Sequence, residues 1–284
     1  MNVIPPTTIE RMPLMPPEEF YATPGLEERP IIFTGGMEHW PARQKWTFEW
    51  FKQTHGHIEA PVEWLKFGLK PDGWVERVGR VEVMKVRDYV EALLSPSRAG
   101  QGYLIGKDML RLLPSLKDDI RFPAFQTSDK MTDRLFFMSP QGAFTQLHYD
   151  RAHNLHAMLV GRKRWQIWSP RYDQVLKQVP HEFVWSVQSV LDLLPHGGKW
   201  ETFPANIAPE YDIVLEAGEM LYLPYGWWHR VLTVEPSIAT NLWWWTWPLF
   251  VRRAPIVVPS VVAGNLLKRF KRYERHTAGR DYRS

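Results

Sequence analysis

The hydrophobic pattern of the chain is most regular between residues 134 and 247. Short runs of apolar and β-branched residues alternate there with turns that contain glycine, proline or aspartate, which is typical of antiparallel strands. Within this region, the segment 155–170 predicts two strands that are separated at Gly161. We therefore expect a mainly β fold with flanking helices, in which this region forms an antiparallel barrel.

The first half of the chain has a mixed pattern. Residues 30–35 predict a strand that runs into a turn, and Thr47 and Gly56 are the expected N-cap and end of a helix. Residues 81–94 begin as a strand or turn and end with apolar residues at helical spacing. This half therefore predicts an α/β extension rather than a continuation of the barrel.

These patterns divide the chain into four parts. Residues 1–17 are rich in proline and lack periodicity, so we expect a loosely held arm. Residues 18–129 form the α/β extension and residues 130–248 the barrel. An insertion with mixed helix and loop signals interrupts the barrel at 172–210, and the C-terminal part, expected to be helical, runs from 249 to 284.

Composition narrows the chemistry that the chain can perform. Cysteine is absent, which excludes disulfides, thiolate catalysis and cysteine-ligated metal centres, and leaves His, Asp and Glu as metal ligands. The hydrophobic fraction of 44% and the charged fraction of 23% are those of a soluble globular protein. No signal peptide and no apolar run of about 18 residues are recognisable, so we expect a cytoplasmic protein with no membrane span.

The net charge of +4 is concentrated at one end. The tail 268–284 contains seven Lys and Arg residues and two acidic ones, so the remainder of the chain is close to neutral. Such a tail is either a solvated end or a docking arm for nucleic acid or another acidic partner.

Candidate metal ligands occur in the stretch Thr145-Gln-Leu-His148-Tyr-Asp150. Residues two apart on a strand point to the same face, so His148 and Asp150 can reach one ion. A further histidine, His229, follows a Pro/Gly turn 79 residues after Asp150. Two histidines and one carboxylate make the facial triad of non-haem Fe(II) oxygenases.

The residues around these three strengthen the interpretation. The chain resembles the JmjC and asparaginyl-hydroxylase branch of the cupin-like, Fe(II)- and 2-oxoglutarate-dependent oxygenases. The resemblance consists of T-x-x-H-x-D, an Asn, G-x-K-R, P-x-x-W-W-H and an Asn on a final strand. Here these are Thr145, His148, Asp150, Asn154, Gly161, Lys163, Arg164, Pro224, Trp227, Trp228, His229 and Asn241.

The resemblance implies a fold and a set of cofactor contacts. The fold is a double-stranded β-helix, or jelly roll, with the three metal ligands inside it and an N-terminal extension packed on it. The cofactors are Fe(II), 2-oxoglutarate and O₂. The residues implied to contact 2-oxoglutarate are Lys163, Thr145, Tyr103, Asn154 and Asn241.

The choice of Lys163 also has a physical basis. The distal carboxylate of 2-oxoglutarate needs a buried cation, because an unpaired buried charge is unfavourable. Lys163, Trp165 and Ile167 share one face of the expected strand, whereas Arg162 and Arg164 share the other.

Three further residues are candidate substrate contacts. His156 lies two residues after Asn154, so both share the inner face of the expected strand. His156 is then either a substrate or supporting contact, or a core histidine with its hydrogen bonds satisfied. Parity also places Trp243 and Trp245 inward with Asn241, where most such tryptophans pack and one or two can stack on a substrate.

The implied reaction is hydroxylation of an unactivated C–H, with succinate and CO₂ as co-products. The substrate is a protein side chain, an RNA or a small molecule, and the sequence does not choose among them. Alternatives are a metal cupin that does not use 2-oxoglutarate, a non-catalytic binding protein, and an N-methyl demethylase of the same family. The resemblance further suggests a homodimer formed through the C-terminal segment, and a lid over the active site formed by residues 172–210.

Overall fold

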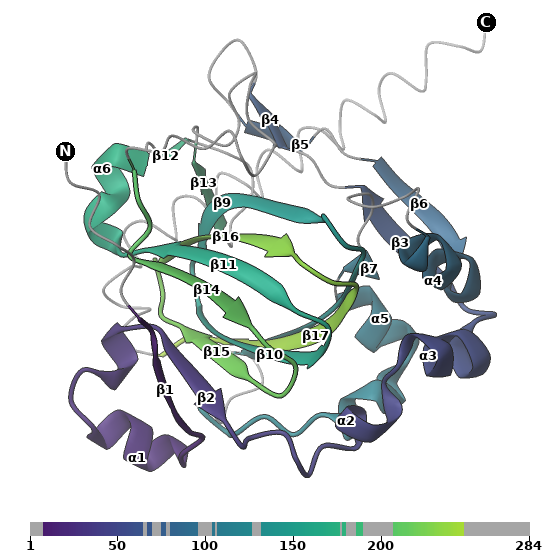
Figure 1. The fold of residues 1–284 in the computed structure, drawn as a ribbon, viewed down its shortest axis with the longest axis horizontal. Coiled ribbons are helices and arrows are strands. Elements are labelled where there is room, and N and C mark those ends of the chain that lie inside the picture. The colour runs from purple at the N-terminus through teal and green to yellow at the C-terminus, as the bar shows by residue number, and fades with distance from the viewer. Residues whose placement is uncertain are drawn as a thin grey trace, which may run out of the picture.

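Two β-sheets dominate the computed structural model (Figure 1). The described residues are 8–64, 67–69, 75–77, 80–95, 104–105, 107–126, 132–176, 178–179, 186–189 and 207–246. The C-terminal segment with its basic tail, the dimer predicted through it, and most of the insertion with its predicted lid lie outside these residues.

The larger sheet has seven strands and combines both halves of the chain. Its neighbouring strands are antiparallel except for the parallel first pair. In spatial order the strands are β1 (Glu10–Pro13), β2 (Ile31–Thr34), β15 (Met220–Leu223), β10 (His153–Val160), β17 (Ser237–Trp244), β8 (Thr132–Ser139) and β7 (Leu104–Ile105).

The second sheet has six antiparallel strands and carries the candidate metal ligands. Their order is β12 (Gln178–Val179), β13 (Ser186–Ser189), β9 (Phe144–Asp150), β16 (Trp228–Thr233), β11 (Lys163–Trp168) and β14 (Tyr211–Leu215).

From β8 to β17 the chain passes repeatedly between the two sheets, as the expected jelly roll requires. The predicted fold class is therefore confirmed. Within the described ranges no strand pairing joins the two sheets, so they form an open pair rather than the closed barrel expected from the strand pattern.

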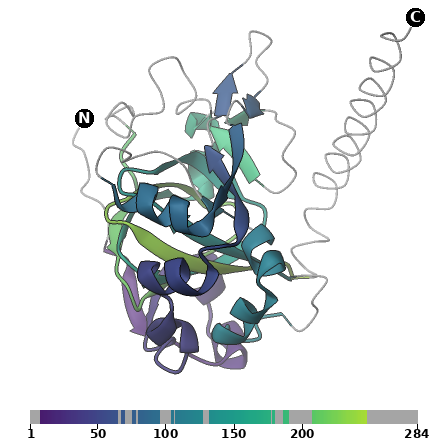
Figure 2. The same cartoon turned by 90° about the vertical axis from the view of Figure 1, so that its right-hand side faces the viewer.

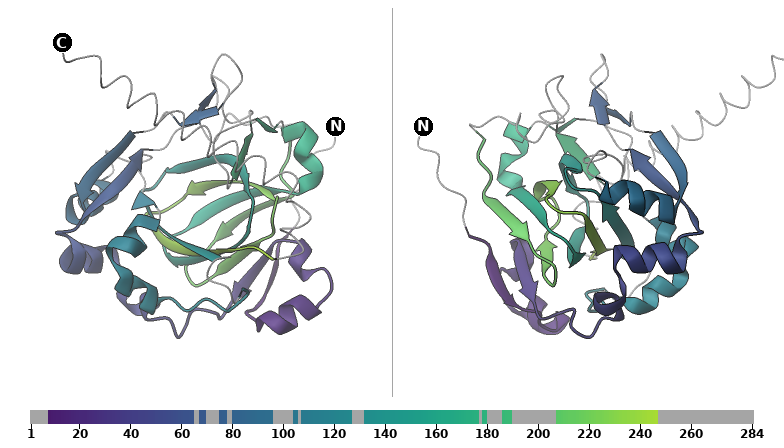
Figure 3. Two further views of the ribbon diagram at one scale, coloured as in Figure 1. Left: turned by 180° about the vertical axis from the view of Figure 1, so that it is seen from behind. Right: turned by 45° about the vertical axis from the view of Figure 1, so that its right-hand side comes forward.

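Helices α3 (Phe48–His55), α4 (Val86–Leu94) and α5 (Lys107–Leu112) lie on one side of the sheets (Figure 2). Further α-helices are α1 (Pro17–Ala22), α2 (Pro41–Lys45) and α6 (Asp173–Leu176). Seen from behind, α6 lies at the opposite end of the molecule from α3 and α4 (Figure 3). Short 3₁₀ turns cover Leu26–Glu28, Pro114–Asp119 and Pro170–Tyr172, and two hairpins pair β3 (Glu59–Trp64) with β6 (Arg80–Lys85) and β4 (Phe67–Leu69) with β5 (Val75–Arg77).

Local signals in the sequence explain several element boundaries. The Thr47 hydroxyl accepts a hydrogen bond from the Trp50 amide at 3.0 Å, so the predicted cap of α3 is confirmed. The predicted separation of two strands at Gly161 is also confirmed, because β10 ends at Val160 and β11 begins at Lys163. Gly161 has a φ of 75°, which glycine adopts readily. A Cβ at this position would lie 2.1 Å from the Pro236 carbonyl oxygen, so the turn excludes any side chain.

Two hydrophobic clusters position the site. One packs Trp46 and Phe51 of the extension against the outer face of the seven-stranded sheet, for example against Phe136. The other lies between the sheets and joins Leu221 to Trp165 and other inward residues. Burying each large apolar side chain contributes about 1.5–3 kcal/mol, so both faces of the larger sheet are held firmly.

The structure differs from the sequence predictions in two places. Residues 8–13 are not a loose arm, because Ile9 is 2% exposed and β1 pairs with β2. β1 is an edge strand, which tolerates Pro13. The strand that pairs with β1 lies further along the chain, so the sequence around residues 8–13 does not reveal it. In the insertion, the short strands β12 and β13 extend the six-stranded sheet where helix and loop were expected. Strands of two to four residues show too little alternation to be recognised in a sequence.

No helix in the described ranges is long and apolar enough to span a membrane.

Candidate metal centre

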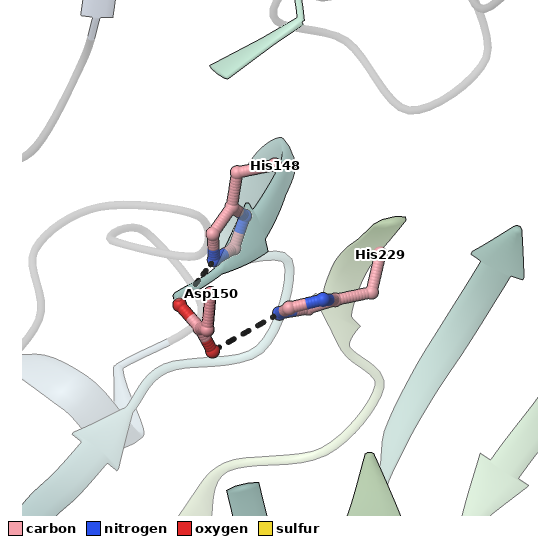
Figure 4. A group of neighbouring side chains, drawn as sticks. All are labelled: His148, Asp150 and His229. Carbon is pink, nitrogen blue, oxygen red and sulfur yellow. Dashed lines mark ion pairs between the residues drawn. The ribbon is translucent and has the colours of Figure 1, made fainter. Parts of the chain in front are cut away.

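Three predicted ligands meet on adjacent strands (Figure 4). His148 and Asp150 lie on β9, and His229 on β16 is the direct cross-strand partner of His148. Tyr149 points to the opposite face, where its ring contacts the Trp228 ring at 4.8 Å. One ligand atom from each of the three residues lies within 4.8 Å of the others, so a single ion could contact all three.

Backbone carbonyl groups orient both histidine rings. The Nδ1 atom of His148 lies 2.7 Å from the Gln146 oxygen, and that of His229 lies 3.0 Å from the Trp227 oxygen. A carbonyl only accepts, so each Nδ1 carries a proton, and in the neutral ring Nε2 presents the lone pair. Such bonds fix the tautomer of metal-binding histidines. Each Nε2 lies 3.7 Å from an oxygen of Asp150, a separation that an ion about 2.0–2.2 Å from each ligand can bridge.

The Asp150 carboxylate is buried and incompletely satisfied. Its Oδ2 accepts a hydrogen bond from Asn154 Nδ2 at 3.3 Å, whereas Oδ1 has no hydrogen-bond partner in the described part of the chain. Burial raises the pKa of Asp150, and His148 and Asn154 oppose this shift. Burial also holds the pKa of His229 well below its ordinary value, with a contribution from His148. Two imidazole nitrogens beside a buried carboxylate form a donor set that fits a divalent cation.

The turn that precedes β16 is hydrogen-bonded to the end of β9. Gly226, with φ of 81°, donates its amide hydrogen to the Asp150 carbonyl at 3.2 Å. The next residue, Trp227, accepts the bond from His229 and donates its indole N–H to the Glu28 carbonyl at 3.2 Å. The N-terminal extension therefore supports the position of His229 through one residue.

Lys163 lies on the inner face of β11, as its phase in the sequence predicts. The residue is 4% exposed, and its Nζ lies 5.3 Å from the centre of the Phe137 ring. It has neither an ion pair nor a hydrogen bond within the described residues. Burial lowers the pKa of Lys163 to about 7. Arg164 points outward instead, where it forms two hydrogen bonds of 2.7 Å with Asp212.

Three other residues predicted to contact 2-oxoglutarate lie on β9, β10 and β17. Thr145 is half-buried on β9 and pairs with Val231. Asn154 contacts Asp150 as described, and its Oδ1 is buried without a partner among the described residues. Asn241 is buried on β17 and its Oδ1 accepts the Leu135 amide hydrogen at 3.2 Å. Tyr103 lies outside the described residues.

The two candidate tryptophans differ from each other. Trp243 is the cross-strand partner of Asn154, and its indole nitrogen is buried without a hydrogen-bond partner among the described residues. Trp245 follows the end of β17, so strand parity does not determine its direction. Its indole N–H donates to the Arg151 carbonyl at 2.6 Å, next to the ligand Asp150.

The rings of Trp165 and Phe137 also contact candidate site residues, although no role in the site was predicted for either. The Trp165 ring lies 5.5 Å from the His229 ring and 5.0 Å from the His156 ring. Phe137 lies 5.6 Å from His156. The sequence could have indicated Trp165, because it lies two residues after Lys163 and so shares the inner face of β11.

Sequence comparisons identify relatives of this chain. The sequence matches the family of the Cupin-like domain over residues 17–248. It is 30% identical over 230 residues to "Lysine-specific demethylase JMJ30" of Arabidopsis thaliana, covering 79% of this chain and 51% of the relative. It is 27% identical over 265 residues to "Bifunctional peptidase and (3S)-lysyl hydroxylase JMJD7" of Homo sapiens, covering 80% and 81%.

A third relative is named for a different substrate. The chain is 27% identical over 237 residues to "tRNA wybutosine-synthesizing protein 5" of Gallus gallus, covering 76% of this chain and 70% of the relative. The matched region spans about half the length of several demethylase relatives, for example 48% of the Xenopus tropicalis "Lysine-specific demethylase 8".

Proposed function

Because the chain belongs to the cupin-like (JmjC) domain family, we propose that it is an Fe(II)- and 2-oxoglutarate-dependent oxygenase that hydroxylates an unactivated C–H. The observation that carries the proposal is a pair of complementary sites between the sheets. One is a donor set for a divalent cation at His148, Asp150 and His229. The other is a buried lysine, Lys163, with no anion beside it in the described part of the chain.

In this proposal the residues divide the work of holding the cofactors. His148, Asp150 and His229 hold the iron, and their three positions leave others open for 2-oxoglutarate and O₂. Lys163 pairs with the distal carboxylate, which offsets the unfavourable burial of both charges. When bound, iron and 2-oxoglutarate supply the oxidising chemistry that converts C–H to C–OH, with succinate and CO₂ as co-products.

The other inward side chains position and shield these groups. Asn154 holds one oxygen of Asp150, so the second oxygen is free to face the metal. The turn at Gly226 and Trp227 keeps Asp150 and His229 in register. Trp165 beside His229 excludes water from that side of the site.

Hydroxylation and demethylation remain to be distinguished, and the relatives include both names. We favour hydroxylation, because the relative named as a lysyl hydroxylase matches over about four fifths of both chains. A protein side chain, an RNA and a small molecule remain candidate substrates. Relatives named for lysine and for tRNA support the two macromolecular classes.

The test uses the full chain loaded with Fe(II) under air. With 2-oxoglutarate we expect slow succinate formation, stimulated by fractions of a cell extract that contain the substrate. A product heavier by one oxygen atom identifies hydroxylation, whereas release of formaldehyde identifies demethylation. A metal-loaded protein that neither binds 2-oxoglutarate nor forms succinate would favour the alternative of a metal cupin that does not use it.

A further inference from the structure

Strand β10 carries two buried histidines that face opposite sides of the seven-stranded sheet. His153 points toward the helical extension, where its Nδ1 lies 3.0 Å from the Tyr222 hydroxyl and its ring stacks on Trp244 at 5.4 Å. That hydroxyl donates to the Glu27 carbonyl, so it accepts from His153. His156 points inward and is 4% exposed. Its Nε2 is buried without a hydrogen-bond partner among the described residues.

Ring contacts connect His156 both with a metal ligand and with Lys163. On one side, its ring contacts Trp165 at 5.0 Å, and Trp165 contacts the ring of His229 at 5.5 Å. On the other side, it contacts Phe137 at 5.6 Å, and the Lys163 ammonium lies 5.3 Å from the same Phe137 ring. One aromatic ring therefore separates His156 from His229, and another separates it from Lys163.

The interpretation of His156 as a satisfied core residue does not fit this environment. A core histidine normally uses its ring nitrogens, as His153 does. Burial, with smaller electrostatic contributions from Lys163 and His229, holds the pKa of His156 well below its ordinary value. The ring is therefore neutral, and a neutral imidazole still has one N–H to donate.

We propose that His156 binds the 2-oxo acid cofactor directly, by donating its Nε2–H to the carboxylate that Lys163 also holds. The inference rests on the proposed function, because it requires that a 2-oxo acid occupy this space. An anionic oxygen supplies the acceptor that the described residues do not, and a hydrogen bond to a charged group is about twice as strong as a neutral one. His156 and Lys163 then hold the same molecule with different chemistry.

The experiment compares the two histidines of β10 as a matched pair. Calorimetry with 2-oxoglutarate is carried out on the full chain loaded with Mn(II), which replaces Fe(II) at such sites without turnover. His156→Phe should weaken 2-oxoglutarate binding roughly ten- to a hundredfold, the effect of losing one hydrogen bond to a charged group. His153→Phe should leave this affinity unchanged.

Thermal unfolding without cofactor should give the opposite ranking. His153→Phe should lower the melting temperature, because the bond with Tyr222 is lost. His156→Phe should leave the melting temperature unchanged or raise it, because it removes a buried polar atom without a partner. A lower melting temperature with unchanged 2-oxoglutarate affinity in His156→Phe would show a structural histidine and overturn the proposal.

A third variant separates hydrogen bonding from shape. His156→Gln keeps an N–H donor and should recover most of the affinity lost in His156→Phe. Equal weakening in the two variants would mean that the shape of the ring, not its N–H, matters, and would also overturn the proposal. Failure of the proposed function itself looks different, because the wild-type protein would then not bind 2-oxoglutarate at all.

Discussion

Replacing Lys163 by methionine should stabilise the cofactor-free protein and weaken the binding of its cofactor. The ammonium is buried without an anion in the described part of the chain, and burial lowers its pKa from 10.5 to about 7. A shift of one pKa unit corresponds to about 1.4 kcal/mol, so the charged lysine destabilises the folded state by about 4 kcal/mol near pH 7. Methionine has a similar length and no charge, so Lys163→Met should recover much of this energy.

The sign of the pH dependence follows from the same shift. The folded state holds the proton less tightly than the unfolded state, so the destabilisation is complete below about pH 7. It disappears as the pH rises from about 7 to 10.5, where lysine in the unfolded chain also loses its proton. The stability advantage of Lys163→Met should therefore be largest at about pH 7 and below, and should vanish near pH 10.5.

Binding of 2-oxoglutarate should respond in the opposite direction. Breaking a buried charge pair by removing one partner costs about 3–5 kcal/mol, which is at least a hundredfold in affinity. Metal binding should survive, because the three ligands lie on other strands. Arg164→Met is the matched control, since Arg164 lies next in the sequence but points outward to Asp212.

Two measurements check this reasoning. Urea unfolding of both variants at pH 7 and pH 10 gives the stabilities, and calorimetry on the Mn(II)-loaded proteins gives the affinities for 2-oxoglutarate. A Lys163→Met protein that is less stable than wild type at pH 7, or that binds 2-oxoglutarate as tightly, would refute the assignment of a buried, unpaired cation. If Arg164→Met lost the affinity instead, the cation would have been misidentified.

Three further predictions concern other parts of the chain. Asp150→Ala should lose most of the bound metal at unchanged fold stability, as metal analysis after dialysis would show; full occupancy would contradict the ligand assignment. Gly161→Ala should lower the free energy of unfolding by about 2 kcal/mol or more, because φ is 75° and the added Cβ would lie 2.1 Å from the Pro236 oxygen; an unchanged urea midpoint would contradict this. Deleting the basic tail 268–284, which lies outside the predicted site motifs, should leave cofactor-dependent succinate formation intact. Light scattering and RNA titrations at two salt concentrations then show whether the tail serves a dimer or an acidic partner. A loss of succinate formation would contradict the prediction that the tail takes no part in the reaction.

Much of the fold and the residue types of the site could be predicted because they depend on residues close together in the chain. The spacing of His148 and Asp150 places both on one face of a strand, and the phase of β11 separates Lys163 from Arg164. The cap at Thr47 and the turn at Gly161 likewise involve a few neighbouring residues. A strand or a cap is a local conformation, so its signal lies within the segment that forms it.

The remaining features depended on contacts between distant segments. The pairing of β1 with β2 made an edge strand of a proline-rich arm, and β13 aligned with β9 beside the metal ligands. The indole of Trp227 bonds to the Glu28 carbonyl, 199 residues away, and no local pattern records such a partner. His153 and His156 are three residues apart on one strand, yet only the packing of the two sheets leaves the first with a hydrogen bond and the second without one among the described residues. Periodicity indicates which face a side chain occupies, whereas the partner that it meets there is decided by the tertiary structure, because that partner comes from another strand.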